Sequence, residues 1–308
     1  MRCADRIPQT GAAIILAMLA VALAASVAAS VLANFGHSLE RASGRHDQNQ
    51  ARLLARGAVD WARNVLADDM QRTSVDHLKE AWAIRIPPTP VGEGEVGGEI
   101  LDRSGLFNIN NLLSDGKPDR AVLEQFGRLL AVIGISGADA TALVHSLETA
   151  IARQSLATSQ GSGHSDNGTA PASPAWPLAD IGELRATNGF DDALLNRLQP
   201  FVTALPAPSR INVNTAPPEV LAALVPGLDL NASRLLVAAR EHAWFRDFAD
   251  FSARLPSSAQ APTAQGVDVK SRHFLVTGRS RFGIAVVGLE VLLDRRETWP
   301  AIIWQRIL

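Results

Sequence analysis

Cysteine is almost absent from this chain of 308 residues: Cys3 is the only one, and there is no tyrosine. Cys3 precedes the first hydrophobic run, so the body of the chain has no thiol for a disulfide, a thiolate metal site or thiol catalysis. An excess of charge of one sign is also lacking, because 29 Lys and Arg face 31 Asp and Glu. The net charge of −2 argues against a protein that works mainly by neutralising nucleic-acid phosphates.

The numbers of proline and glycine residues are also low, at 17 and 23, while 47% of the chain is hydrophobic. This composition excludes collagen-like and disordered chains. The length allows about two domains with a buried core.

The most informative segment is a run without charge over residues 12–35. As a helix, these roughly 24 residues would measure about 36 Å, enough to cross a hydrocarbon core about 30 Å thick. The segment before this run contains two basic residues, Arg2 and Arg6, and one acidic residue, Asp5. This weakly basic leader predicts that the body of the chain lies away from the cytoplasm. The predicted membrane helix includes Ala12, Ile14, Leu16, Leu19, Val21, Leu23, Val27, Val31 and Phe35.

Three kinds of N-terminal signal fit this run. The first is a secretory signal cleaved after residues 31–33, and the second is an uncleaved anchor. The third is a prepilin-type signal cut after Gly11, which leaves Ala12 as the new N-terminus. The sequence that follows favours the third, because a helical pattern resumes beyond the membrane instead of starting a new domain.

That second helical pattern lies within residues 51–70. Apolar Ala51, Leu54, Ala58, Trp61 and Val65 follow one another in steps of three and four, which predicts a single buried stripe. No proline occurs between residues 12 and 86. We therefore expect one helix over residues 12–68, about 85 Å long.

The rest of the chain predicts strands at both ends of a helical block. Residues 73–113 are expected to be extended and turn-rich, because Pro87, Pro88 and Pro90 break any helix, and a short strand is expected over 99–102. Helical patterns follow from about residue 110, and the Ser/Gly/Ala/Pro-rich segment 155–175 is expected to be a mobile loop. Alternation through Val287, Leu289, Val291 and Leu293 predicts a strand, with neighbours over 271–277 and 299–307. The expected fold class is α+β.

Smaller motifs carry little functional information. Gly92, Gly94 and Gly97 spell G-x-G-x-x-G, but they follow a proline run and precede no helix, so we expect a flexible loop. No two of the seven histidines are three or four residues apart, and no G-x-S-x-G motif occurs. Nothing here calls for an enzyme.

Residues 221–241 are similar to a helix-hairpin-helix, a unit that often holds DNA phosphates. Asp229 places negative charge beside the hairpin amides, and Arg234 and Arg240 are too few for a basic footprint. We expect a structural helix pair here, with Pro217 and Pro218 in a first turn and Asn231 as an N-cap.

Several blocks, in order, identify a family. They are GAAIILAMLAVALA at 11–24, ARLLARGAVDWARNVLADDM at 51–70, DHLKEAWA at 76–83, GGEILDRSGLFNINNLL at 97–113 and PFVTALPAPSRINVNTAPPEVLAALVPGL at 200–228. The chain resembles the type II secretion system protein K family, the large minor pseudopilins of general secretion. The resemblance covers most of the chain.

The resemblance implies a cut by prepilin peptidase between Gly11 and Ala12, with methylation of the new amine. It also implies a pilin-like long helix packed on a small antiparallel sheet, with a large inserted helical domain. The expected parts are a leader (1–11), a transmembrane helix (12–35), the helix continuation and first strands (36–105), the insertion (106–268) and the last strands (269–308).

The implied function is structural. With minor pseudopilins I and J and other pseudopilins, the chain would form the tip that initiates or caps a periplasmic pseudopilus for export of folded proteins. The expected location is the bacterial inner membrane, single-pass, with the bulk in the periplasm. Leu16, fifth after the cut, stands where most pilin-like subunits carry a glutamate. A subunit with no neighbour above it gains nothing from that carboxylate, so Leu16 fits a tip position.

Calcium binding is not carried over from the family. Where the family often has an acidic stretch, this chain has residues 145–150, with Glu148 as the only hard oxygen ligand. Asp191 and Asp192 are the remaining candidates, and no cofactor is predicted. Two alternatives stay open: a tip subunit of a related type IV pilus-like filament, and a membrane-tethered periplasmic nucleic-acid binder. The sequence blocks at 103–113 and 211–224, together with Leu16, argue against the pilus subunit. The slight excess of acidic residues argues against the nucleic-acid binder.

Overall fold

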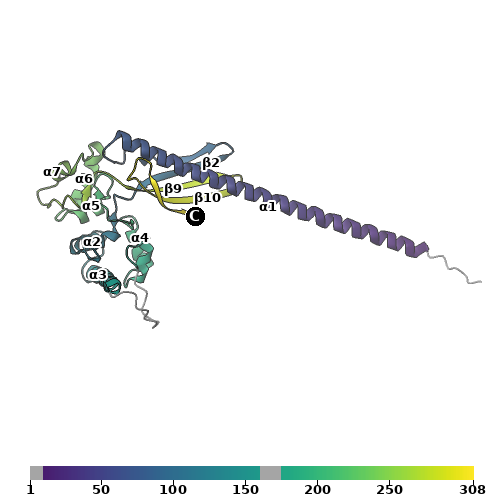
Figure 1. The fold of residues 1–308 in the computed structure, drawn as a ribbon, viewed down its shortest axis with the longest axis horizontal. Helices are drawn as coiled ribbons and strands as arrows, with labels where there is room; N and C mark the ends of the chain where they lie inside the picture. The colour runs from purple at the N-terminus through teal and green to yellow at the C-terminus, as the bar shows by residue number, and fades with distance from the viewer. Residues whose placement is uncertain (1–9, 160–174) are drawn as a thin grey trace, which may run out of the picture.

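The longest element is a single helix that projects far beyond the rest of the molecule (Figure 1). The computed structural model describes residues 10–159 and 175–308. Helix α1 (Thr10–Arg72) has 63 residues, or about 95 Å at 1.5 Å per residue. One continuous helix across residues 12–68 is therefore confirmed, and Gly36, Gly44 and Gly57 lie within it. The predicted leader lies outside the described residues up to residue 9.

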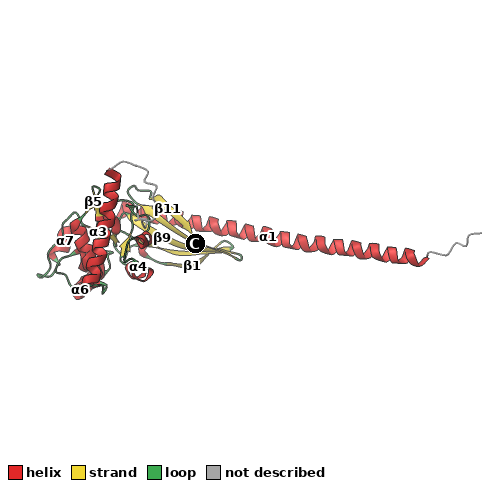
Figure 2. Ribbon diagram, turned by 90° about the horizontal axis from the view of Figure 1, so that it is seen from below, coloured by secondary structure: helices red, strands yellow, loops and turns green. Residues whose placement is uncertain are grey.

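A five-stranded antiparallel sheet packs against the C-terminal part of α1. Its order is β1-β2-β9-β10-β11, so strands from the two ends of the head region share one sheet. The bounds are β1 (Ile86–Val91), β2 (Gly94–Asp102), β9 (His273–Phe282), β10 (Ala285–Asp294) and β11 (Ala301–Ile307). The strands predicted at both ends of the helical block are confirmed. In Figure 2, β1 and β11 lie at opposite edges of the sheet.

The glycine motif is part of this sheet. Gly92 forms the β1–β2 turn at φ +60°, where a side chain would be strained. Gly94 and Gly97 lie within β2 and pair with Phe282 and Arg279 of β9. The flexible loop expected over residues 92–97 is therefore wrong, because cross-strand hydrogen bonding orders the segment.

Helix α1 faces the sheet mainly through alanines. The buried positions of α1 are Ala51, Ala55, Val59, Ala62 and Leu66. The predicted stripe through Ala51, Leu54, Ala58, Trp61 and Val65 shares only Ala51 with them, and Trp61 is 50% exposed. The predicted phase was wrong by about one residue, because alanine side chains let the helix approach the sheet more closely than leucine and tryptophan do.

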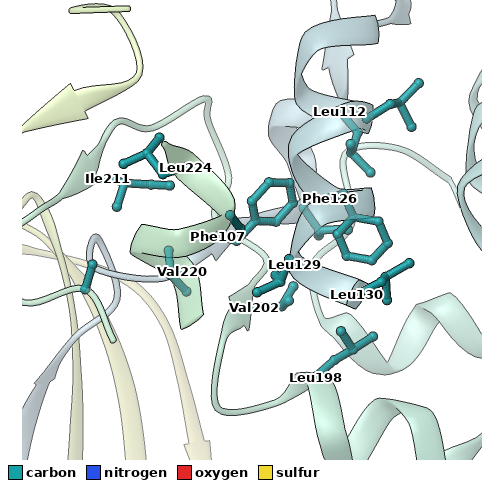
Figure 3. Close-up of a cluster of buried hydrophobic side chains, with 14 of the residues drawn as sticks. Phe107, Leu112, Phe126, Leu129, Leu130, Leu198, Val202, Ile211, Val220 and Leu224 are labelled. Atoms are coloured by element: carbon teal, nitrogen blue, oxygen red, sulfur yellow. The ribbon is translucent and has the colours of Figure 1, made fainter. Parts of the chain in front are cut away.

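Between β2 and β9 the chain forms a compact group of helices with its own core. Phe107, Phe126, Leu129 and Leu198 belong to that core (Figure 3). The helices are α2 (Arg120–Val132), α3 (Ala138–Ser159), α4 (Asp192–Leu198), α5 (Pro218–Leu224), α6 (Leu230–His242) and α7 (Phe248–Ala253), with 3-10 turns η2 (Ile109–Leu112) and η3 (Ile181–Ala186). A further 3-10 turn, η1 (Ala81–Ala83), lies outside this group, between α1 and β1.

Short two-residue strand pairs hold the ends of this helical group together. β3 (Phe107–Asn108) pairs in parallel with β6 (Val202–Thr203), and β7 (Ile211–Asn212) with β8 (Val267–Asp268). β4 (Leu113–Ser114) and β5 (Lys117–Pro118) form an antiparallel pair. The long helix, the antiparallel sheet and the inserted helices make the fold α+β, as predicted.

Two local expectations need correction. The side chain of Asp229, not Asn231, caps α6 by accepting a hydrogen bond from the Ala232 amide at 2.8 Å. Helix α3 continues through Ser159, so the first five residues of the segment 155–175 are helical. Residues 160–174 lie outside the described residues. Pro217 and Pro218 do stand at the start of α5, as predicted.

Candidate functional site

The N-terminal half of α1 exposes its apolar side chains. From Ile14 to Phe35 the large hydrophobic residues are 55–74% exposed, and Leu16 is among them. The Gly11–Ala12 peptide bond lies in the first turns of the helix. The head begins at His46 and Asp47, where the His46 ring meets Phe282 and Asp47 accepts a hydrogen bond from the Ile284 amide at 3.3 Å. A stretch that is both apolar and this exposed requires an apolar environment or a partner.

An apolar groove of about 550 Å³ runs between α1 and the β1–β2 hairpin. Leu54, Gly57 and Trp61 of α1 form one wall, and Ile86 and Val96 of the hairpin form the other. The groove exists because paired Gly98 and Gly278 place no side chain beneath the helix. The side chains of Leu54 and Trp61, predicted as core, therefore line a surface groove.

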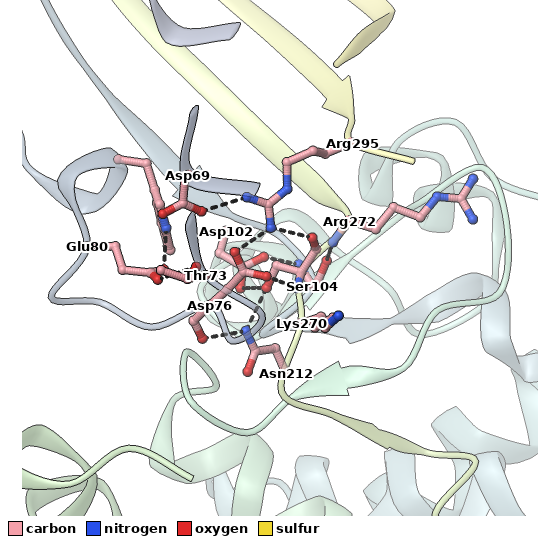
Figure 4. Close-up of polar contacts among 12 residues, drawn as sticks. Asp69, Thr73, Asp76, Glu80, Asp102, Ser104, Asn212, Lys270, Arg272 and Arg295 are labelled. Carbon is pink, nitrogen blue, oxygen red and sulfur yellow. Dashed lines mark hydrogen bonds and ion pairs between the residues drawn. The ribbon is translucent and has the colours of Figure 1, made fainter. Parts of the chain in front are cut away.

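A buried charged cluster joins the end of α1 to the sheet (Figure 4). The Arg295 guanidinium donates from Nη1 to Asp69 Oδ2 at 2.8 Å, from Nη2 to Asp76, and from Nη2 to the Ser271 carbonyl at 2.9 Å. It also stacks over the Phe274 ring at 4.6 Å. Burial, the largest cause, together with the neighbouring Glu80 charge, raises the pKa of Asp69 to about 6.

Glu80 organises the turn after α1. It accepts hydrogen bonds from Thr73 Oγ1 at 3.0 Å, from the His77 amide at 2.9 Å and from Trp82 Nε1 at 2.7 Å. The His77 ring stacks on Trp244 at 4.1 Å, which connects this turn to the helical insertion. The turn is therefore fixed by contacts on both sides.

Asp102, at the end of β2, connects the sheet to the insertion. It accepts hydrogen bonds from Ser271 Oγ and Thr215 Oγ1, each at 2.5 Å, and from the Ser104 amide at 2.7 Å. Burial raises its pKa to about 6, although these hydrogen bonds act in the opposite direction. Asn212 completes the junction by donating to Ser271 Oγ at 2.7 Å and to the Asp76 carbonyl at 3.1 Å.

The same cluster offers the donor set of a metal site. Carboxylate oxygens of Asp69, Asp76 and Glu80 lie within 4.8 Å of one another. Arg295, however, supplies positive charge to Asp69 and Asp76, and Glu80 is engaged by three donors. The donors fit a structural ion-pair junction better than a cation site.

The candidate calcium residues occupy other positions. Glu148 lies on the exposed face of α3, 3.9 Å from His145. Asp191 caps α4 by accepting from the Leu194 amide at 2.8 Å, and Asp192 pairs with Arg185 at 2.5 Å. Within the described residues they form no common carboxylate cluster.

The helix-hairpin-helix segment is built from α5, a turn at Gly227 and α6. Gly227 has φ +78°, and its position leaves no room for a Cβ beside the Ser258 carbonyl. Arg240 is buried and donates from Nη1 to the Val213 carbonyl at 2.5 Å, so it points into the protein. Of the two arginines considered for phosphate contact, only Arg234 is on the surface. The α5–α6 helix pair therefore presents one of these two arginines to solvent.

The charged junction was not found from the sequence, although one signal points to it. Asp69 follows Ala62 and Leu66 at helical spacing, so it lies on the buried face of α1. A carboxylate on a buried stripe needs a partner. The partner, Arg295, is separated from Asp69 by more than 200 residues, and no pattern names it.

An extended apolar helix that is long enough to cross a membrane and continues into a head with an antiparallel sheet and a helical insertion defines a pilin-like fold. Two family models described as type II secretion system protein K match residues 105–207 and 211–270. The chain is 32% identical to type II secretion system protein K of Pseudomonas aeruginosa, over 89% of this chain and 85% of the relative. The same protein of Klebsiella pneumoniae is 30% identical, over 87% of each chain.

The chain belongs to the type II secretion system protein K family. Its fold is shared with a chain of the crystal structure of the GspK-GspI-GspJ complex from enterotoxigenic Escherichia coli. The TM-score is 0.69 at 22% identity, covering 87% of this chain and 99% of that one.

Proposed function

We propose that this chain is a minor pseudopilin that assembles with the minor pseudopilins I and J at the tip of a periplasmic pseudopilus. The observation that carries the proposal is the pilin-like architecture of a protein K family member, with an exposed apolar helix at one end and the helical insertion at the other (Figure 1). The solved complex named for GspK, GspI and GspJ supports these partners.

The proposed membrane arrangement follows from α1. Residues 12–35 cross the inner membrane, and residues 36–45, about 15 Å of helix, separate it from the head in the periplasm. Prepilin peptidase cuts between Gly11 and Ala12, and the new amine is methylated. Because the helix is continuous from Thr10, the processed chain begins directly as helix.

The tip position rests on where the insertion lies. Helices α2–α7 gather around the C-terminal end of α1 and to one side of it, far from its N-terminal end (Figure 1). In a filament whose subunits pack by parallel α1 helices, this bulk obstructs another subunit above. Leu16 agrees with that position, because a tip subunit has no upper neighbour to pair with a carboxylate there.

The proposed parts keep the predicted boundaries: leader 1–11, transmembrane helix 12–35, continuation and first strands 36–105, insertion 106–268 and last strands 269–308. We propose an assembly role without catalysis, bound calcium or nucleic acid as partner. The pairing of Arg240 with the Val213 carbonyl and of Arg295 with Asp69 supports structural roles for these residues.

The first experiment is the intact mass and N-terminal peptide of the protein extracted from membranes. A chain that starts at Ala12 and carries one added methyl group supports prepilin processing. A start near Asn34 means a conventional secretory signal, and the membrane anchor and pseudopilus assignments then fail together.

The second experiment is assembly of the full chain in detergent with pseudopilins I and J of the same secretion system. A ternary complex at micromolar concentration supports the tip assignment, and its absence counts against it. Adding DNA to the same preparation tests the nucleic-acid alternative, for which salt-dependent binding is the signature.

A further inference from the structure

One flank of α1 carries a row of arginines. Arg41, Arg45, Arg52 and Arg56 are all exposed, and their spacing of four and seven residues places them within about 60° of one another around the helix axis. We call these four residues the arginine row. Arg63 continues it, so its contacts show which way the flank points.

The arginine row points toward the side of the head where β11 lies. Arg63 Nε donates to the Pro300 carbonyl at 2.8 Å, and its guanidinium lies 4.5 Å from the centre of the Trp299 ring. Both residues directly precede β11. The apolar groove beside Trp61 lies on the opposite flank of α1, next to the β1–β2 hairpin.

Among the described residues, no member of the arginine row forms an ion pair. Arg41 donates only to the His37 carbonyl, at 3.0 Å. Other surface arginines of the head are paired, such as Arg281 with Glu95 at 2.8 Å and Arg306 with Asp180 at 3.0 Å. Like charges four residues apart on a helix repel, so the row destabilises α1 until a counter-charge from outside meets it.

Beside the arginine row, β11 offers apolar side chains on an open edge. Ile302 and Ile307 pair with Leu293 and Leu289, which are buried under α1, so both lie on the α1 face of the sheet. They are 43% and 56% exposed. The opposite edge strand, β1, contains three prolines. Proline has no backbone N–H to donate to a neighbouring strand, so β1 is poorly suited to pair with a further strand.

We propose that this flank of α1, together with Ile302 and Ile307, docks a protein partner that presents carboxylates at helical spacing. The inference rests on the proposed function and specifies the chemistry of one contact in the assembly. The matching surface is an acidic helix lying along α1 with Asp or Glu at steps of four or seven, over about 22 Å. Apolar residues at its side meet β11.

An anionic lipid surface is the other source of negative charge, and distance argues against it. Arg52 and Arg56 lie about 17 and 21 residues beyond Phe35, or about 25 and 31 Å along the helix. Headgroups extend only about 5–8 Å beyond the hydrocarbon core. Lipid therefore reaches at most Arg41 and Arg45, whereas a protein helix reaches the whole row.

The test uses the full chain in detergent with pseudopilins I and J, and measures the dissociation constant at 50 and 300 mM salt. The test variant is Arg52→Glu/Arg56→Glu. The matched control is Arg153→Glu/Arg234→Glu, which makes the same charge change at exposed positions of α3 and α6. We expect the test variant to raise the dissociation constant at least 10-fold at low salt and to lose most of the salt dependence, with the control within 2-fold of wild type.

The outcomes separate the two proposals. If the wild-type chain forms no complex, the proposed function fails. If it forms one and the test variant binds equally well with the same salt dependence, the docking surface is overturned. Reconstitution into vesicles with and without 30% phosphatidylglycerol gives a third result. If this lipid slows amide hydrogen exchange at residues 41–56 in the wild type but not in the test variant, and the complex is unchanged, the row is assigned to lipid and the proposal is also overturned.

A folding defect is controlled by a second variant. Arg52→Gln/Arg56→Gln removes the charges with good helix formers, and we expect at least a 3-fold rise in the dissociation constant. Thermal unfolding of both variants, followed by circular dichroism, must occur at or above the temperature at which the wild type unfolds. A normal fold with unchanged binding in the glutamine variant also overturns the proposal.

Discussion

His273 is a fully buried histidine for which the described residues offer neither ring nitrogen a hydrogen-bond partner. Burial, followed by the positive charge of Arg272, lowers its pKa to about 4, so the ring is neutral near pH 7. Unsatisfied buried polar atoms destabilise a fold by about 1–3 kcal/mol.

We expect His273→Leu to raise the free energy of unfolding by about 1 kcal/mol, because it removes two unpaired polar atoms at similar volume. Urea unfolding of the full chain in detergent, followed by tryptophan fluorescence, measures it. His273→Ala serves as the control and should destabilise through the cavity that it leaves. A loss of stability in the leucine variant would show that the ring has a partner.

Two adjacent arginines provide a second test at the residue scale. Arg295 is buried between Asp69 and Asp76, whereas the Arg296 side chain is 68% exposed beside Asp294. Removing one partner of a buried ion pair leaves an uncompensated charge and costs about 3–5 kcal/mol. A surface pair contributes about 0–1 kcal/mol.

Arg295→Met should therefore lower the free energy of unfolding by about 3–5 kcal/mol, and Arg296→Met by less than about 1 kcal/mol. The same urea titration compares them. Equal effects in the two variants would contradict the assignment of Arg295 as the centre of the junction.

At the scale of elements, glycines show how closely α1 approaches the sheet. A Cβ on Gly57 would meet nothing within 4 Å, whereas one on Gly94 would lie 2.4 Å from Leu54 Cδ1 and 2.7 Å from the Arg281 carbonyl. Gly57→Ala should stabilise by about 0.5–1 kcal/mol through helix propensity. Gly94→Ala should destabilise by about 1–3 kcal/mol through overpacking.

Thermal unfolding of the two alanine variants measures this difference, and each serves as the other's control. Stabilisation by Gly94→Ala would mean that β2 lies farther from α1 than the structure shows. If Gly57→Ala leaves the stability unchanged, the helix propensity of residue 57 does not affect the stability of the protein.

Elements were predictable where one local pattern dominates. The absence of proline and the charge-free run predicted α1, and the alternation through Val291 predicted β10, because each pattern depends only on neighbours in sequence. The phase of the buried stripe was not predictable, because Leu54 and Ala55 fit a helical period equally well and only the sheet selects between them. The junction joins Asp76 to Ser271, 195 residues apart, which no local period encodes.

At the scale of the whole molecule, these charged groups set how stability depends on pH. Asp69 and Asp102 have pKa values raised from 3.8 to about 6, so the folded state binds their protons more tightly than the unfolded chain. These two groups increase stability as the pH falls from 7 toward 5. The pKa of His273 is lowered from 6.5 to about 4, so this residue decreases stability as the pH falls over the same range.

We expect a net rise in the free energy of unfolding between pH 7 and 5, larger in His273→Leu and smaller in Asp102→Asn. Below pH 4 stability should fall, because the hydrogen bond from Arg272 holds the pKa of Asp294 at about 2 while the unfolded carboxyl takes up its proton near 3.8. Urea titrations at pH 7, 6, 5 and 3.5 measure this. A steady decline from pH 7 to 5 in His273→Leu would contradict it.

The length of α1 makes the protein a lever. Transmembrane helices tilt by about 20° on average, and over about 95 Å such a tilt displaces the far end sideways by about 30 Å. In the proposed membrane arrangement, a small rotation at the base of α1 therefore becomes a large sideways movement of the head. The position of the head is therefore decided by the neighbours that contact α1 along its length. A small shift in a contact near the N-terminal end of α1 produces a larger shift of the head.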